Sequence, residues 1–192
     1  NEADNLIGSA MGLLGVAYGV FRSPYVTNQY VPVEQPVQFS HEHHVKALGL
    51  DCRYCHTSVE TQGFAGIPPT ETCMTCHSQI WRDARMLAPI RQSLADNQPV
   101  NWTRVHDLPD YAYFHHAVHV KKGVGCVSCH GRVDLMPLVW KDQPLTMEWC
   151  LECHREPERH LRPADKIFDM TWSAGGEAAQ LALGKELVRK NH

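Results

Sequence analysis

Cysteine spacing constrains this sequence more than any other feature. All eight cysteines of the 192-residue chain lie in CxxCH units, which run from Cys52 to His56, Cys73 to His77, Cys126 to His130 and Cys150 to His154. In such a unit the two thiols form thioether bonds to the vinyl groups of a haem, and the adjacent imidazole becomes the proximal iron ligand. The pattern therefore predicts four haem c groups. The predicted attachment residues are Cys52, Cys55, Cys73, Cys76, Cys126, Cys129, Cys150 and Cys153, and the predicted proximal ligands are His56, His77, His130 and His154.

Three other kinds of site use CxxC pairs. The first two pairs are separated by 17 residues and the last two by 20, which also suits a zinc ribbon. A four-thiolate zinc site does not need a histidine after each second cysteine, and with 13 His in 192 residues four such neighbours arise by chance only about two times in 100,000. Disulfides and thioredoxin-like redox pairs leave the histidines equally unexplained.

An internal repeat supplies candidates for the second axial ligand of each iron. Phe39 to Lys46 and Phe114 to Lys121 share the pattern FxHxxHVK, and each precedes two CxxCH units. On a helical turn, the two imidazoles of an HxxH pair project from one face and can reach two different irons. Two such pairs match four haems and favour six-coordinate iron with two histidine ligands. The predicted distal ligands are His41, His44, His116 and His119, with His106 beside Asp107 as an alternative.

The remaining histidines and the methionines are expected to have structural roles. A lone histidine is more often a surface or hydrogen-bonded core residue, and this reading is assigned to His43, His115, His160 and His192. A methionine ligand would raise the potential of its haem. The methionines are nevertheless expected to fill gaps around the macrocycles, namely Met74, Met86, Met136, Met147 and Met170.

The N-terminal segment is apolar. From Leu6 to Phe21 sixteen residues carry no charge, slightly fewer than the roughly 20 that span a bilayer. Four glycines, at positions 8, 12, 15 and 19, fall on one helical face, where another membrane helix can approach closely. A transmembrane anchor is favoured over a secretory signal, which needs a basic start, and over a buried soluble helix. The net charge of −3 offers no basic surface for nucleic acid.

These features predict a mainly α fold with much irregular structure, built from two di-haem modules and one transmembrane helix. A helix that is broken or kinked at Pro89 is expected over residues 79–97, and another helix over residues 177–190. The expected organisation is an anchor (1–24), an extended tether (25–38), a first di-haem module (39–97), a connector (98–113), a second di-haem module (114–172) and a C-terminal helix (173–192).

Several longer runs resemble the multihaem cytochrome subunit of bacterial alternative complex III, a quinol:electron-acceptor oxidoreductase. They include Phe64 to Cys73, Arg104 to Asp110, Gly123 to Cys126 and Met147 to Cys150, with VAYG and SPYV near the anchor. The resemblance implies a single-pass protein of the cytoplasmic membrane, in contact with lipid, with its haems on the periplasmic face. It also implies partner subunits: a polytopic quinol-binding protein, an iron-sulfur protein and a monohaem cytochrome c.

The chain departs from that family in one respect. The family is typically pentahaem and four motifs are present, so a fifth haem is expected only if the native chain extends beyond His192, with His106 as its candidate ligand. The expected function is electron relay, without a catalytic residue in this chain. The alternatives are a self-contained tetrahaem quinol dehydrogenase feeding nitrate or nitrite reductases, and a multihaem nitrite reductase with an open iron face, against which the matching ligand supply argues.

Overall fold

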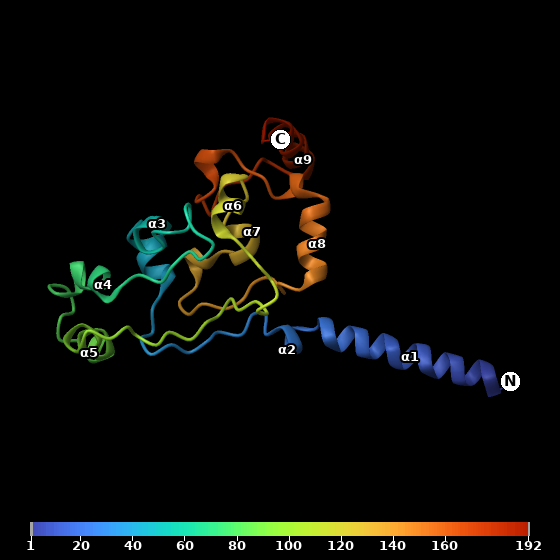
Figure 1. Cartoon of the computed structure of the whole chain (residues 1–192), viewed down its shortest axis with the longest axis horizontal. Coiled ribbons are helices and arrows are strands. Elements are labelled where there is room, and N and C mark those ends of the chain that lie inside the picture. The colour runs from blue at the N-terminus through green and yellow to red at the C-terminus, as the bar shows by residue number, and fades with distance from the viewer. Residues whose placement is uncertain (1, 192) are drawn as a thin grey trace.

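Helices and irregular segments make up the computed structural model, which describes residues 2–191 (Figure 1). Within that range there is no β-strand, and isolated β-bridges join Gln29 to Lys141 and Val124 to Leu161. The mainly α, irregular fold expected from the sequence is confirmed. The α-helices are α1 (Glu2–Arg22), α2 (Pro24–Thr27), α3 (Cys52–Cys55), α4 (Thr70–His77), α5 (Ala88–Asp96), α6 (His116–Lys121), α7 (Val127–His130), α8 (Met147–Arg155) and α9 (Glu177–Asn191). A π-helix, η1 (Glu42–Ala47), and four 3-10 turns, η2 (Arg85–Leu87), η3 (Val133–Leu135), η4 (Pro157–Arg159) and η5 (Ala164–Lys166), complete the elements.

Helix α1 projects from the rest of the chain (Figure 1). None of its residues is buried, and its length of 21 residues and mean hydropathy of 1.2 allow it to cross a membrane. A membrane anchor and a signal sequence both meet these criteria.

The segment after α1 is partly helical and is hydrogen-bonded along its path. Its first residues form α2, so the expected extended tether begins only after Thr27. Further on, the Tyr30 amide donates to the Lys141 carbonyl at 2.9 Å, and the Val33 amide donates to the Val139 carbonyl at 3.1 Å. The tether is therefore fixed along residues 139–141, because its amides find partners there.

The helix expected over residues 79–97 is wrong in its first half. Residues 79–83 form turns, η2 follows at Arg85, and α5 begins only at Ala88. Pro89 lies in the first turn of α5, where its missing amide breaks no helical hydrogen bond. The helix is therefore broken ahead of Pro89, which is one of the two expected outcomes, and it is not kinked there.

Two small apolar clusters form the side-chain core. Val37, Leu87 and Ile90 make one cluster, and the other consists of Val59, Val120 and Ile167. The expected C-terminal helix is present as α9, which packs closely on η4. So little buried side-chain surface agrees with a chain built to pack around large apolar groups.

Candidate haem-binding site

Each histidine of an HxxH pair faces the histidine of a CxxCH unit. The ring centroids lie 6.5 Å apart for His41 and His56, and 6.2 Å apart for His44 and His77. In the second half of the chain the corresponding distances are 6.4 Å for His116 and His130, and 6.1 Å for His119 and His154.

These spacings suit two imidazoles on opposite sides of one metal ion. With metal–imidazole bonds of about 2.0 Å, the ring centres of two trans ligands lie about 6 Å apart. The gap is too wide for direct ring stacking at van der Waals contact. The residues present therefore fit haem iron with two axial histidines.

The two halves also repeat the orientations of the rings. The planes of the first pair in each half are nearly parallel, 3° apart for His41 and His56 and 12° for His116 and His130. In the second pair of each half the planes are crossed, by 64° in one and 72° in the other. The internal repeat seen in the sequence is therefore also a repeat of ligand geometry.

In each half, a phenylalanine contacts both histidines of the HxxH pair. Phe39 stacks on His44 with centroids 4.4 Å apart and meets His41 edge-on at 4.9 Å. In the other half, Phe114 stacks on His119 with centroids 4.4 Å apart and meets the first histidine of that pair, His116, edge-on at 4.7 Å. Sequence reasoning noted this phenylalanine as the first letter of the repeat and gave it no role. Its recurrence in both halves was the signal that could have identified it.

Backbone carbonyls hold several of these rings through Nδ1. His44 Nδ1 lies 2.8 Å from the Ser40 carbonyl, and His119 Nδ1 lies 2.9 Å from the carbonyl of His115, the residue that matches Ser40 in the repeat. Among the proximal histidines, His56 Nδ1 lies 2.7 Å from the Gly66 carbonyl, and His77 Nδ1 lies 3.1 Å from that of Ile80. Because Nδ1–H donates to a carbonyl, Nε2 is left free to bind a metal.

The halves differ at the first histidine of each pair. His116 Nδ1 lies 2.9 Å from the Gly63 carbonyl, whereas Nδ1 of His41 is buried without a partner. The supporting elements differ as well, because η1 carries His44 on a π-helix and α6 carries both of its histidines on an α-helix. Single-turn π segments are often found at functional sites.

His106 lies inside the structure and does not face a proximal histidine across a metal-sized gap. Its ring centroid is 4.4 Å from that of His130, with the planes at 68°, and its Nε2 is buried without a partner. Asp107, expected to orient it, instead pairs with Arg104 at 3.0 Å. Because His116 already faces His130, His106 is an additional imidazole beside that pair.

Burial lowers the pKa of several of these imidazoles. It lowers the pKa of His41 to about 4 and that of His130 to about 3, with neighbouring histidines adding to the effect. Burial also lowers the pKa of His106 to about 4. A neutral imidazole has a free lone pair, which is the state that binds a metal.

Two of the thiols, those of Cys126 and Cys129, are neutral as well. Burial raises the pKa of Cys126 to about 11 and that of Cys129 to about 12. A reactive thiolate of the thioredoxin kind needs a lowered pKa, which these cysteines lack. Within residues 2–191 no three His, Cys, Asp or Glu side chains converge as the ligands of a zinc ribbon would.

The four CxxCH units form a row in space whose order differs from their order in the sequence. Burial is the main cause that raises the pKa of Cys55, Cys126 and Cys129, and a neighbouring thiol is the next. That neighbour is Cys73 for Cys55, Cys52 for Cys126 and Cys153 for Cys129. These neighbours place the units in the order 73–77, 52–56, 126–130 and 150–154. Figure 1 shows the same order as α4, α3, α7 and α8.

His43 borders one of the four imidazole pairs without belonging to it. His43 stacks on the exposed Trp81 at 5.7 Å, and Trp81 in turn lies 6.4 Å from the ring of His77. Trp81 has a φ of 51°, which is unusual for a bulky residue. Sequence reasoning placed it in a helix and so gave it no part in the site. His192 lies outside the described residues.

The methionines are divided between interior and surface. Met136 and Met170 are buried, as expected for gap-filling residues, and Met74 packs against the first apolar cluster. Met86 and Met147 are instead largely exposed, at 51% and 69%.

Two comparisons with known proteins agree with this geometry. Residues 19–87 match the class III cytochrome c family, and this part of the chain holds the first HxxH pair and the first two CxxCH units. The chain is also 37% identical over 105 residues to the menaquinone reductase multihaem cytochrome c subunit of Nitratidesulfovibrio vulgaris, an alignment that covers 53% of this chain and 48% of the relative. The chain thus spans about half the length of that relative. Class III cytochromes hold covalently bound haem c, and the part of this chain from residue 19 to residue 87 is similar to them.

Proposed function

We propose that this protein is a multihaem electron-transfer subunit of a membrane quinone or quinol oxidoreductase. The observation that carries the proposal is the set of four facing imidazole pairs, whose centroids are 6.1 to 6.5 Å apart. A pair of histidines fills both axial positions of an iron and leaves no position for a substrate, so the arrangement suits electron relay better than bond chemistry.

The chain's own residues have simple roles in this function. The eight cysteines attach four haems, and the histidines at 56, 77, 130 and 154 are the proximal ligands. His41, His44, His116 and His119 are the distal ligands, which makes residues 39–97 and 114–172 two di-haem modules. The haems, once bound, supply one-electron couples at low potential. Hydrogen bonds from Nδ1 to backbone carbonyls hold several of these imidazoles in place.

The finer proposal concerns the complex. The N. vulgaris relative is named as a subunit of a menaquinone reductase, and the motifs of this chain resemble those of alternative complex III. We infer that this chain works beside a polytopic quinone-binding subunit, an iron-sulfur subunit and a monohaem cytochrome c. Helix α1 is its membrane anchor, and the haem domain lies on the periplasmic face.

A self-contained quinol dehydrogenase is the weaker alternative. It would need a pocket for a lipid-soluble quinol close to the membrane. A groove of about 560 Å³ lies between the start of α4 and the end of α5, lined by residues such as Pro69, Asn97 and Trp102. That groove is at the end of the molecule opposite α1, where a quinol dissolved in the bilayer does not arrive (Figure 1).

The first test is to purify the native protein from detergent-solubilised membranes. Intact mass spectrometry should give the chain with four covalently bound haems, and replacing Cys150 and Cys153 with Ala should remove one of them. Co-purifying iron-sulfur and polytopic subunits would support the complex. A colourless chain with free thiols, or quinol oxidation by the isolated chain, would contradict the relay function.

A further inference from the structure

The junction between α1 and the haem domain is held by side chains as well as by the backbone. The guanidinium of Arg22, at the end of α1, pairs with the carboxylate of Glu148 in the first turn of α8. Gln29 Nε2 donates to the Asp142 carbonyl at 3.0 Å, beside the backbone bond of Tyr30 to Lys141. Helix α1 is therefore tied to the start of α8, and α8 carries the Cys150–His154 unit.

The opposite end of the molecule carries another unit of the row. Figure 1 shows α1 leaving the domain at the end where α8 lies, and α4 and α5 at the other end. Between them come α3 and α7. The loop after α3 is joined to the start of α6, because the His116 amide and its Nδ1 both reach the Gly63 carbonyl. The row of CxxCH units thus runs away from α1, starting at α8 and finishing at α4.

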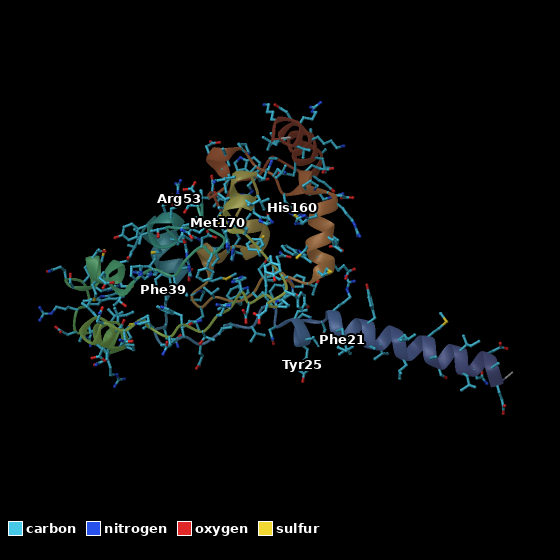
Figure 2. The ribbon with its side chains drawn as sticks, viewed as in Figure 1. Phe21, Tyr25, Phe39, Arg53, His160 and Met170 are labelled. Atoms are coloured by element: carbon cyan, nitrogen blue, oxygen red, sulfur yellow. The ribbon has the colours of Figure 1, made fainter. Side chains whose placement is uncertain are left out.

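Apolar and aromatic side chains surround the junction. Phe21 is 69% exposed, Tyr25 is 89% exposed, and Met147 at the start of α8 is 69% exposed. Figure 2 shows Tyr25 projecting away from the haem domain at the base of α1. Aromatic side chains beside an arginine at the end of an apolar helix are typical of the membrane–water interface, where a ring has one apolar and one polar surrounding.

We propose that the start of α8 rests on the phospholipid headgroup layer, so that the Cys150–His154 unit is the membrane-facing end of the row and the Cys73–His77 unit is its water-facing end. The proposal rests on the proposed function, in which α1 spans the membrane. A redox partner inside the bilayer then meets the α8 end of the row, and a soluble partner meets the α4 end. Counted away from α1, the units follow in the order fourth, third, first and second.

The test uses lipid photocrosslinking of the full-length, haem-loaded chain in phosphatidylethanolamine–phosphatidylglycerol nanodiscs. A benzophenone amino acid replaces Met147 at the α8 end or, as the matched control, the exposed Met86 beside α5. A third variant carries it at Leu14 in α1. Illumination should link lipid to position 147 at least tenfold more than to position 86, as measured by intact mass, and position 14 should be linked strongly.

The three positions separate the possible failures. Labelling at position 14 without labelling at position 147, or equal labelling at positions 147 and 86, overturns the orientation while leaving the anchor intact. Absence of lipid at position 14 instead contradicts the anchor, and with it the proposed function. The haem absorption spectrum of each variant shows whether the domain has folded with its haems.

A second experiment tests the ion pair between Arg22 and Glu148. In the chain labelled at position 147, Arg22→Ala or Glu148→Gln should reduce lipid crosslinking severalfold, because each removes the contact that holds α8 against α1. Crosslinking at position 14 should not change in either variant. Unchanged crosslinking at position 147 would show that the ion pair does not set the orientation.

Discussion

At the scale of single residues, the candidate site depends on how each imidazole is held. Phe39 and Phe114 stack on the second histidine of each pair, and a backbone carbonyl four residues earlier accepts from the Nδ1 of that same histidine. Each ring is therefore fixed in direction and in tautomer before any metal is present. A histidine lacking both contacts is free to rotate away from the metal.

Removing one distal histidine should affect one iron. In His119→Ala the iron opposite His154 loses its sixth ligand, so one of the four haems should change from low-spin to high-spin in the electron paramagnetic resonance spectrum. His44→Ala should do the same for the iron opposite His77. The matched control is His43→Ala, which removes the neighbouring histidine that stacks on Trp81 and should leave all four irons low-spin. A high-spin signal in the control, or its absence in both other variants, would contradict the ligand assignment.

Gly131 is required by both its backbone and its surroundings. Its φ of 58° and ψ of −156° belong to a region that is almost restricted to glycine, and a Cβ there would overlap the carboxylate of Asp142. Gly131→Ala should therefore lower the free energy of unfolding by about 2–4 kcal/mol. Guanidinium titration followed by haem absorbance measures this. Gly175→Ala is the control, because Gly175 has a φ of 90° with open space around it and carries only the backbone cost. Equal losses in the two variants would show that the overlap with Asp142 has no effect.

At the scale of elements, close packing depends on a few small residues. Helix α9 lies against η4, and an added Cβ on Gly184 would overlap the carbonyl of Glu158. The same interface holds an ion pair at 2.7 Å between Arg159 and Glu177, and Gln180 Nε2 donates to the Leu161 carbonyl at 2.8 Å. Contacts to backbone fix α9 more firmly than its weak amphipathic pattern would.

Gly184→Ala should displace α9. The alanine raises helix propensity by about 1 kcal/mol, but the overlap with the η4 backbone outweighs this gain, so a net loss of thermal stability is expected. Limited proteolysis should cut more readily near residues 173–176, ahead of α9. Ala182→Leu provides the control, since it adds more volume at an exposed position of the same helix and should leave the proteolysis rate unchanged. Faster cleavage in the control than in Gly184→Ala would contradict this account.

At the scale of the whole molecule, one apolar helix projects from a domain that has little core of its own. No residue of α1 is buried, and the ion pair between Arg22 and Glu148 is half exposed. Ion pairs of this kind are worth about 1 kcal/mol or less, so the ion pair orients the helix but does not support the fold of the domain.

Deleting residues 1–22 should therefore separate membrane attachment from haem binding. The shortened chain, directed to the periplasm by an unrelated cleaved leader, should appear in the soluble fraction with an unchanged haem spectrum. The full-length chain should remain in membranes washed with high salt and leave them only in detergent, because apolar burial does not weaken with ionic strength. Release of the full-length chain by salt alone would contradict the anchor.

Local pattern was sufficient for much of the site. The CxxCH spacing and the FxHxxHVK repeat act within one or two helical turns, so the sequence identified the histidines that face one another in the structure. The same local reasoning failed between residues 79 and 87, which are not α-helical and where Trp81 stacks on the distant His43. Likewise, His106 was a plausible ligand because Asp107 follows it in the sequence, and only its position beside His130 separates it from the pairs.

The sequence by itself determined which side chains can attach and ligate haem, because thioether chemistry and ligand spacing are properties of short segments. The tertiary structure decided the order of the CxxCH units in space, since this order arises from contacts between distant segments, such as His116 with Gly63. It also decided which unit lies next to α1, through Arg22 and Glu148, which are 126 positions apart in the chain. Such long-range contacts leave no periodic signal in the sequence, because they depend on how separate modules pack together.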